Sequence, residues 1–235
     1  MFPAKGFAII IRRGDRMLKF PCLVLDHDDT VVQSEATINY PYFCYILDKF
    51  RPGQKITWEE YIYGCCHLGF AEMCRQQYHF TEEELKEEYL GWKDFIRNHI
   101  PAPYPGIASI IHRQKAEGGL ICVVSHSSEE NILRDYKTHF GILPDAIYGW
   151  DLPEEKRKPN TFSLEDIMRK YHLIPKDLLV VDDLKPAAEM SHNAGVSAAF
   201  AAWSKTNLAS IGEDLTKLYD FTFYSPKEME IFLFD

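Results

Sequence analysis

Short apolar runs recur along this chain, and helical patterns separate most of them. Strands are predicted at residues 22–26, 120–124, 178–182, 197–201 and 220–224. Helices are predicted at residues 106–118, 161–172 and 184–194. Because strands that alternate with helices pair in parallel, the pattern predicts an α/β fold, a doubly wound parallel sheet with helices on both faces.

Residues 34–102 break this alternation. The stretch has no strand-like apolar run, and two capping boxes, Thr57–Glu60 and Thr81–Glu84, indicate the starts of helices. It is rich in Tyr, Phe and Trp, which favours a small packed core. We therefore predict that residues 1–33 and 103–235 form a Rossmann-like core, with an α-helical cap inserted at 34–102.

The N-terminal residues allow two interpretations. Residues 7–20 could form a hairpin that turns at Gly14–Asp15. Alternatively, Met17 is the natural start, and residues 1–16 are an extension without function. Residues 1–19 are thus a hairpin or an extension of the core.

Composition narrows the choice of partners. The formal net charge of -9 over 235 residues argues against nucleic acid, because phosphate backbones bind basic surfaces. No apolar run approaches the ~20 residues of a membrane span, and charged residues interrupt the N-terminal apolar stretch. Cys22 and Cys122 lie in apolar strand-like runs, as small buried hydrophobes do. We expect a reduced, cytoplasmic setting, no membrane partner, and a monomer or homodimer.

The candidate chemistry begins with Asp26-His27-Asp28-Asp29-Thr30, directly after the first strand. Three carboxylates within four residues repel one another, so a cation is expected beside them. Ligands of parallel sheets bind at the carboxyl ends of the strands. The polar residues that follow the other strands, or precede the third, are Ser125, His126, Lys158, Asp182 and Asp183. Carboxylate oxygens suit Mg²⁺, and a Lys and a Ser suit a phosphoryl group.

Four ordered motifs carry a resemblance to a known family. They are Asp-x-Asp-x-Thr at 26–30, an apolar strand ending in Ser125, Lys158-Pro159, and a strand ending in Asp182-Asp183. Over about residues 20–225 the chain resembles the haloacid dehalogenase-like hydrolases, in the branch with a helical cap after the first motif.

The resemblance implies a role for each matching residue. Asp26 would be the nucleophile that becomes an aspartyl-phosphate, and Asp28 would be the general acid and base. Mg²⁺ would be held by the Asp26 carboxylate, the Asp28 backbone carbonyl and Asp183, with Asp182 beside it. The phosphate-binding set would be Thr30, which also braces the loop, Ser125, His126 and Lys158.

Three positions depart from the family pattern. His27 stands where an aromatic or aliphatic residue is more common, and Asp29 stands where Gly is frequent. Ala187 replaces a further Asp. None of these changes removes a required group, but Asp29 has no assigned role.

The predicted function is Mg²⁺-dependent hydrolysis of a small phosphorylated metabolite, such as a sugar phosphate. Asp28 argues against dehalogenase chemistry, because that branch lacks an acid there. A phosphosugar mutase would share all four motifs. A phosphonate-cleaving enzyme would need an imine-forming cap lysine, for which the candidates are Lys49, Lys55, Lys86 and Lys93. A non-catalytic phosphometabolite-binding protein is the remaining alternative.

Cys65-Cys66-His67 fits no common zinc spacing.

Overall fold

A computed structural model describes residues 18–204 and 214–235 of the chain. The hairpin or extension predicted for residues 1–19 falls almost wholly outside the described residues and stays a prediction.

The described residues contain a six-stranded sheet in which every pair of neighbours is parallel. Its strands are β1 (Cys22–Leu25), β2 (Leu120–Val124), β3 (Ala146–Tyr148), β4 (Leu178–Asp182), β5 (Ser197–Ala201) and β6 (Phe221–Phe223). The order β3-β2-β1-β4-β5-β6 is that of a doubly wound fold, which confirms the predicted fold class. The five predicted strands are present to within one residue at each end. The prediction missed β3, a three-residue edge strand with too short an apolar run to stand out.

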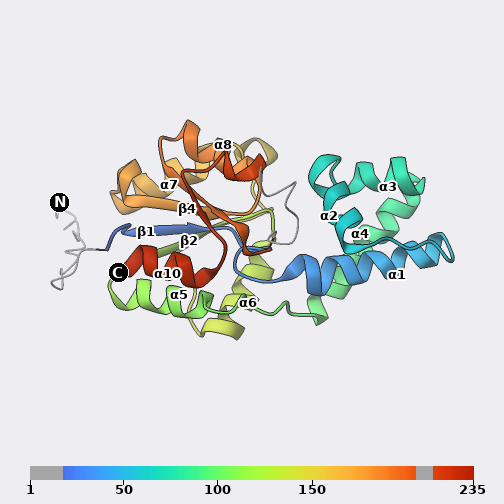
Figure 1. The fold of residues 1–235 in the computed structure, drawn as a ribbon, viewed down its shortest axis with the longest axis horizontal. Helices are drawn as coiled ribbons and strands as arrows, with labels where there is room; N and C mark the ends of the chain where they lie inside the picture. Colours follow the sequence, from blue (N-terminus) through green and yellow to red (C-terminus); the bar gives the residue numbers. More distant parts are fainter. Residues whose placement is uncertain (1–17, 205–213) are drawn as a thin grey trace, which may run out of the picture.

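Alternation along the strands divides the core into two layers. Leu23 and Leu25 of β1 pack with α5 (Ile107–Ala116), α6 (Glu129–Phe140) and α10 (Pro226–Phe234). Cys22 and Val24 face the other way and pack with α7 (Phe162–Tyr171) and α8 (Lys185–Asn193). Figure 1 shows α5, α6 and α10 below the strands and α7 and α8 above them. Both faces of the sheet are therefore buried, as a parallel sheet requires.

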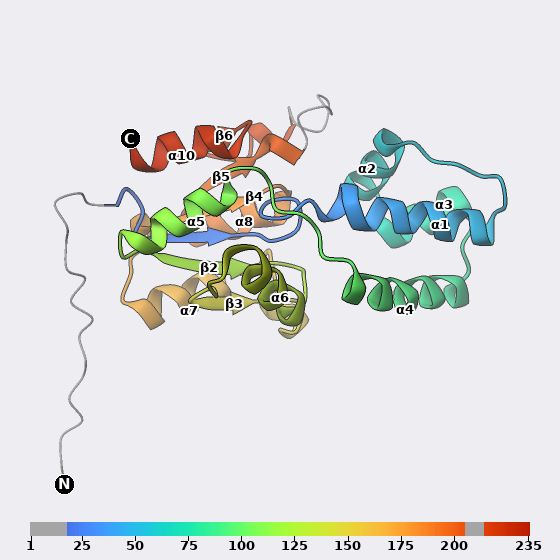
Figure 2. The same cartoon turned by 90° about the horizontal axis from the view of Figure 1, so that it is seen from below.

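The segment predicted to be a cap is helical. It contains the short π-helix η1 (Glu35–Asn39), followed by α1 (Tyr40–Phe50), α2 (Trp58–His67), α3 (Phe70–Tyr78) and α4 (Glu82–Asn98). Thr57 and Thr81 cap α2 and α4 through reciprocal bonds with Glu60 and Glu84, so both predicted capping boxes are confirmed. In Figure 2 these helices lie beside the sheet, and two connecting segments of the chain join them to it. The boundaries at residues 34 and 102 stay a prediction.

Aromatic residues fill the interior of this helical segment. The ring of Phe43, which is 1% exposed, lies 5.5 Å from the rings of Tyr61 and Phe70 and 5.6 Å from that of Tyr78. These buried rings form the core of the segment, as predicted. None of the helices in the described ranges combines the length and apolar character needed to cross a membrane.

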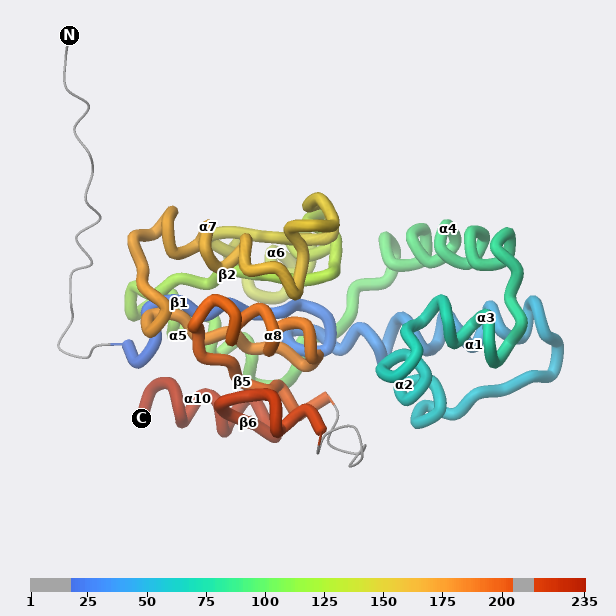
Figure 3. The backbone as a smooth tube through the Cα atoms, turned by 90° about the horizontal axis from the view of Figure 1, so that it is seen from above, coloured from blue at the N-terminus to red at the C-terminus, as the bar shows by residue number. Residues whose placement is uncertain are grey.

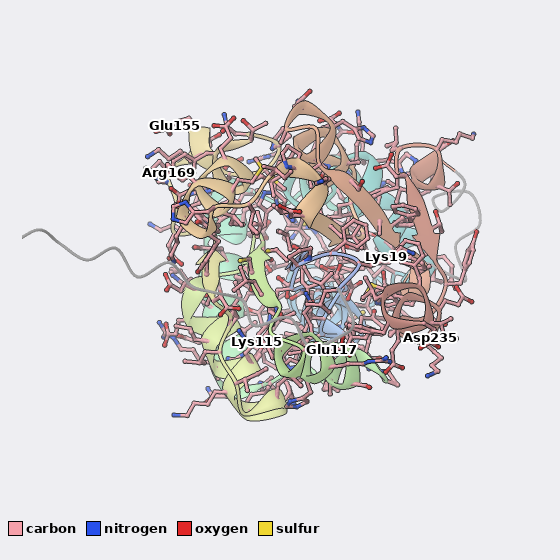
Figure 4. All side chains as sticks on the ribbon, turned by 90° about the vertical axis from the view of Figure 1, so that its left-hand side faces the viewer. Lys19, Lys115, Glu117, Glu155, Arg169 and Asp235 are labelled. Carbon is pink, nitrogen blue, oxygen red and sulfur yellow. The ribbon has the colours of Figure 1, made fainter. Side chains whose placement is uncertain are left out.

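The strands run toward the helical segment. Figure 3 shows that the chain passes from β1 into α1 at that end of the sheet and returns from α4 toward α5. The opposite end of the core, seen in Figure 4, carries ordinary surface charges such as Lys115, whose ammonium contacts Asp145 at 2.7 Å. The carboxyl ends of β1, β2 and β4 thus face the helices of residues 35–98, and this is where the candidate chemistry lies.

Candidate active site

The loop after β1 is a tight turn held by several backbone hydrogen bonds. The amide of Asp26 donates to Val181 O of β4 at 2.9 Å, and His27 O accepts from the amides of Val31 and Val32. Asp29 adopts a φ of 55°, in the left-handed region. Glycine reaches that region at no steric cost, and Asp is one of the few other residues that does so readily. The backbone therefore explains why Asp29 can stand where Gly is frequent.

Asp29 also has a structural partner. Its Oδ1 accepts the amide of Glu35 at 3.0 Å, where η1 begins. An acceptor at a helix start satisfies an amide that has no partner within the helix. The residue left without a role by the motif comparison thus links the loop after β1 to the first helix of the cap.

Ser125 directly follows β2, at the same end of the sheet as the loop after β1. Its side chain is buried, its amide donates to Tyr148 O at 3.0 Å, and its Oγ accepts the amide of Ser127 at 3.1 Å. The cap of α6 is Ser128, which accepts the amide of Asn131. Ser125 is therefore not the helix cap, which leaves the predicted phosphate-binding role in place.

Lys158 reaches the carboxyl ends of β1 and β4 together. Its Nζ lies 2.8 Å from Asp26 Oδ1 and 2.6 Å from Asp182 Oδ2, and its side chain is 4% exposed. Burial alone would lower the pKa of this amine, but the Asp182 and Asp26 carboxylates outweigh burial and raise it. Lys158 is therefore a fixed positive charge between two carboxylates.

Asp182 and Asp183 complete an acidic group with Asp26. Oxygen atoms of the three carboxylates all lie within 4.8 Å of one another, and each residue is at most 5% exposed. Asp182 Oδ1 also accepts the amide of Leu184 at 2.8 Å. Burial raises the pKa of Asp182, as do the charges of Asp26 and Asp183, while Lys158 lowers it. Among the described residues, this is the one cluster of metal-ligand types that is close enough to share an ion.

Asp28 lies two residues beyond Asp26, on the rim of the same site. Burial raises the pKa of its carboxyl group, and the neighbouring charge of Asp26 adds to the effect, whereas a positive charge on His27 opposes it. A carboxyl group that keeps its proton above its ordinary range is suited to donate that proton. Asp28 therefore has the environment of a general acid.

A cavity of about 130 Å³ opens at this point between core and cap. From the core it is lined by Asp26, Asp28, Asp29, Ser125, His126, Lys158, Asp183 and Leu184. From the cap it is lined by Glu35 of η1 and by Ile62, Cys65 and Cys66 of α2. The sequence did not predict these four cap residues, because no motif distinguishes Glu35 or the face of α2 that meets the core.

Of the predicted phosphate-binding residues, Thr30 differs from the expectation in detail. The hydroxyl of Thr30 is buried with no hydrogen-bond partner in the described structure, so it does not brace the loop through a hydrogen bond. Thr30 instead contributes its backbone carbonyl, which accepts Trp203 Nε1 at 3.2 Å. His126 does line the cavity, and partial burial and the charge of Lys158 lower its pKa.

The comparison with protein families agrees with the four motifs. Residues 23–201 match the family model of haloacid dehalogenase-like hydrolases. The chain belongs to this family. A search of curated proteins gave no match.

Solved structures share the fold at low sequence identity. The chain is similar to a predicted phosphoglycolate phosphatase from Haemophilus somnus, with a TM-score of 0.70, 19% identity, and coverage of 92% of this chain and 99% of that one. CbbY from Rhodobacter sphaeroides, solved in complex with phosphate, gives a TM-score of 0.63 at 17% identity, covering 91% and 96%. A hydrolase of the same family from Deinococcus radiodurans, with bound phosphate and sodium, has a TM-score of 0.68 and 16% identity. This match covers 90% of this chain and 93% of that one.

Proposed function

We propose that this protein is a Mg²⁺-dependent phosphoric monoester hydrolase that acts on a small phosphorylated metabolite. The observation that carries the proposal is the contact of Lys158 with both Asp26 and Asp182, at 2.8 and 2.6 Å, beside Asp183. A buried cation and clustered carboxylates at the ends of β1 and β4 are the fixed charges that phosphoryl transfer requires. Membership of the hydrolase family and the phosphate bound by two similar proteins support the same chemistry.

The donor set fits Mg²⁺. Asp26, Asp182 and Asp183 place carboxylate oxygens at two neighbouring strand ends, and hard oxygen donors are those that Mg²⁺ prefers. We assign the Asp26 and Asp183 carboxylates and the Asp28 carbonyl as ligands, with Asp182 beside them. When bound, the ion would offset charge on the transferring phosphoryl group.

The reaction follows from the two aspartates of the loop. A carboxylate oxygen of Asp26 attacks phosphorus, while Lys158, bonded to Oδ1, holds the carboxylate in place. Asp28 gives its proton to the leaving alcohol oxygen as the ester P–O bond breaks. The ionised Asp28 then takes a proton from water, which attacks the phosphorus of the aspartyl-phosphate. Phosphate leaves, and Asp26 and protonated Asp28 are restored.

The same side chains explain how the phosphoryl group is held. Ser125, His126 and Lys158 line the cavity together with Asp26, and the cavity volume of about 130 Å³ favours a small substrate. Lys158 would offset the charge of a phosphoryl oxygen, and the Ser125 hydroxyl would donate to another. Thr30 would act through the backbone of the loop.

The lysines that a phosphonate-cleaving enzyme would need lie elsewhere. Lys49 and Lys86 line a groove between α1 and α4, where Lys49 contacts Glu87 at 2.6 Å. Lys93 lies over the ring of Tyr89. None of the four candidate cap lysines is among the described residues that line the cavity. This arrangement favours ester hydrolysis over imine chemistry.

The test is a panel of phosphate esters assayed for released phosphate with Mg²⁺, with isomerised sugar phosphates measured in parallel. We expect phosphate release by the wild type and none above background by Asp26→Asn. Asp214→Asn, an exposed position that contacts Lys217, is the matched control and should keep wild-type activity. Isomerised product without phosphate release would instead identify a mutase. Full activity of Asp26→Asn would overturn the assignment of the nucleophile.

A further inference from the structure

His27 lies between the two catalytic aspartates but contacts a different part of the protein. Asp26 contacts Lys158, whereas the His27 side chain packs toward α6, with its ring 6.0 Å from that of Tyr136. His27 shares one peptide bond with Asp26 and another with Asp28, so fixing its side chain restrains the backbone that carries both aspartates. The side chain is 1% exposed, and a polar group buried so deeply requires a partner.

That partner is a buried carboxylate of α6. His27 Nε2 lies 3.0 Å from Asp135 Oδ2, and Asp135 is also 1% exposed. Because an ionised carboxylate can only accept, Nε2 is the nitrogen that carries the proton in this bond. The bonds to His27 and Arg134 lower the pKa of Asp135, although burial alone would raise it. The imidazole is thus held in one orientation by a charged acceptor.

The chain of contacts continues from Asp135 into the cap. Arg134 Nε donates to Asp135 Oδ1 at 2.7 Å, and one of its terminal nitrogens donates to Ile96 O at 2.6 Å. Ile96 lies in the last turn of α4, whose final carbonyls have no partner within the helix. A guanidinium there also interacts favourably with the negative end of the helix dipole. Arg134 therefore contacts both the end of α4 and Asp135, the residue that binds His27.

We propose that Arg134 and Asp135 are positioning residues for the proposed hydrolysis, which link the last cap helix to the peptide between Asp26 and Asp28. His27 is the final member of the link. The hydrogen bonds of this link are short, involve charged groups and are at least partly buried, which makes them strong and directional. A small cavity of about 30 Å³ borders Asp28, Asp135, Arg134 and Ile96, so the general acid lies beside the link. The position of α4 then determines how the catalytic loop is held.

The first test needs no turnover. Amide hydrogen exchange of residues 26–32 is compared between the wild type, Arg134→Gln and Arg97→Gln. Arg97 is the matched control, since it lies one residue after Ile96 and pairs with exposed Asp94. We expect Arg134→Gln to accelerate exchange in residues 26–32 and at the end of α4. Arg97→Gln should leave residues 26–32 unchanged. Unchanged exchange in residues 26–32 of Arg134→Gln would overturn the proposal, whether or not the protein hydrolyses any ester.

The second test separates positioning from folding. With p-nitrophenyl phosphate, Arg134→Gln should lower kcat by about tenfold or more and leave KM within about twofold, because misplacing a reacting group slows chemistry rather than binding. Arg134→Lys keeps the charge and should recover part of the loss. In a His27→Phe background the effect of Arg134→Gln should disappear, since the link is already broken. An equal loss of kcat in both backgrounds would show that Arg134 does not act through His27.

Discussion

The ammonium nitrogen of Lys158 lies 2.8 Å from Oδ1 of Asp26, although 132 residues separate the two in sequence. The same nitrogen contacts Asp182 on the neighbouring strand β4. β1 and β4 meet where the strand order changes direction, which is the position of ligand sites in doubly wound sheets. The fold therefore gathers the proposed nucleophile, its counter-charge and the acidic group at one point.

Replacing Lys158 should damage both activity and stability. In Lys158→Met the carboxylates of Asp26 and Asp182 lose a buried partner, and breaking a buried ion pair costs about 3–5 kcal/mol. We expect the free energy of unfolding to fall by about this amount in chemical denaturation, and phosphate release to be lost. Lys156→Met is the matched control, because the amine of Lys156 lies over the ring of Phe162 and not in the site. Unaltered phosphate release by Lys158→Met would contradict the role given to this residue.

Asp28 should matter most when the leaving group is poor. An alkoxide needs a proton as it departs, whereas p-nitrophenolate leaves without help. We therefore expect Asp28→Asn to lose at least about a hundredfold in kcat/KM, which reports phosphoryl transfer to Asp26, on an alkyl phosphate and much less on p-nitrophenyl phosphate. Comparing kcat/KM for the two esters in the same variant separates proton donation from the later attack of water, which is common to both. Equal losses on both would argue against a proton donor.

Mg²⁺ should stabilise the folded protein through Asp183. An ion that binds only the folded state at a hundred times its Kd adds about 2.7 kcal/mol. Thermal unfolding after chelation and again with added Mg²⁺ should thus show a rise in Tm for the wild type. Asp183→Asn should reduce that rise, and Asp214→Asn should keep it. If Mg²⁺ shifts the Tm of Asp183→Asn as much as that of the wild type, Asp183 is not a ligand.

Glu88 should make the stability of the cap depend on pH. Burial raises the pKa of this carboxyl group from 4.5 to about 7, and the residue is 7% exposed. The pKa of Glu88 is higher in the folded state than in the unfolded state, so its contribution to stability is fully present below pH 4.5. This contribution is lost as the pH rises through about 7. The linked loss is about 3 kcal/mol between pH 4.5 and 8.

The matched variants for this prediction are neighbours on α4. In denaturation experiments across this pH range, Glu88→Gln should remove most of the decline. Glu87→Gln, at an exposed position paired with Lys49, should keep it. A decline that is the same in the wild type and in Glu88→Gln would place the pH dependence elsewhere.

Much of the core could be predicted because its signals are local. The run Cys22–Leu25 is apolar and is followed by Asp26, and the apolar part of Leu178–Asp182 ends at Asp182. A short apolar run of this kind is typical of a buried parallel strand. The side chains at their carboxyl ends could then be placed together by topology alone. The edge strand Ala146–Tyr148 has only three residues, so its pattern was too short to recognise.

The remaining parts of the site depend on contacts that the sequence does not display. Cys65 and Cys66 line the cavity because of how α2 packs against the core, and no local pattern encodes that docking. The positive φ of Asp29 and the bond from His27 to Asp135, 108 residues away, are likewise properties of the assembled backbone. His27 and Asp29 were recognised as departures from the family pattern, but their partners could not be named.

If Asp26 carries the phosphoryl group during turnover, borohydride reduction detects it most directly. A turnover mixture with an accepted ester and Mg²⁺ is quenched and reduced, which converts an aspartyl-phosphate to homoserine, and the peptides are sequenced by mass spectrometry. We predict homoserine at position 26, dependent on substrate and absent in Asp26→Asn. Continued phosphate release with unmodified Asp26, or with homoserine at another aspartate, would show that Asp26 is not the nucleophile.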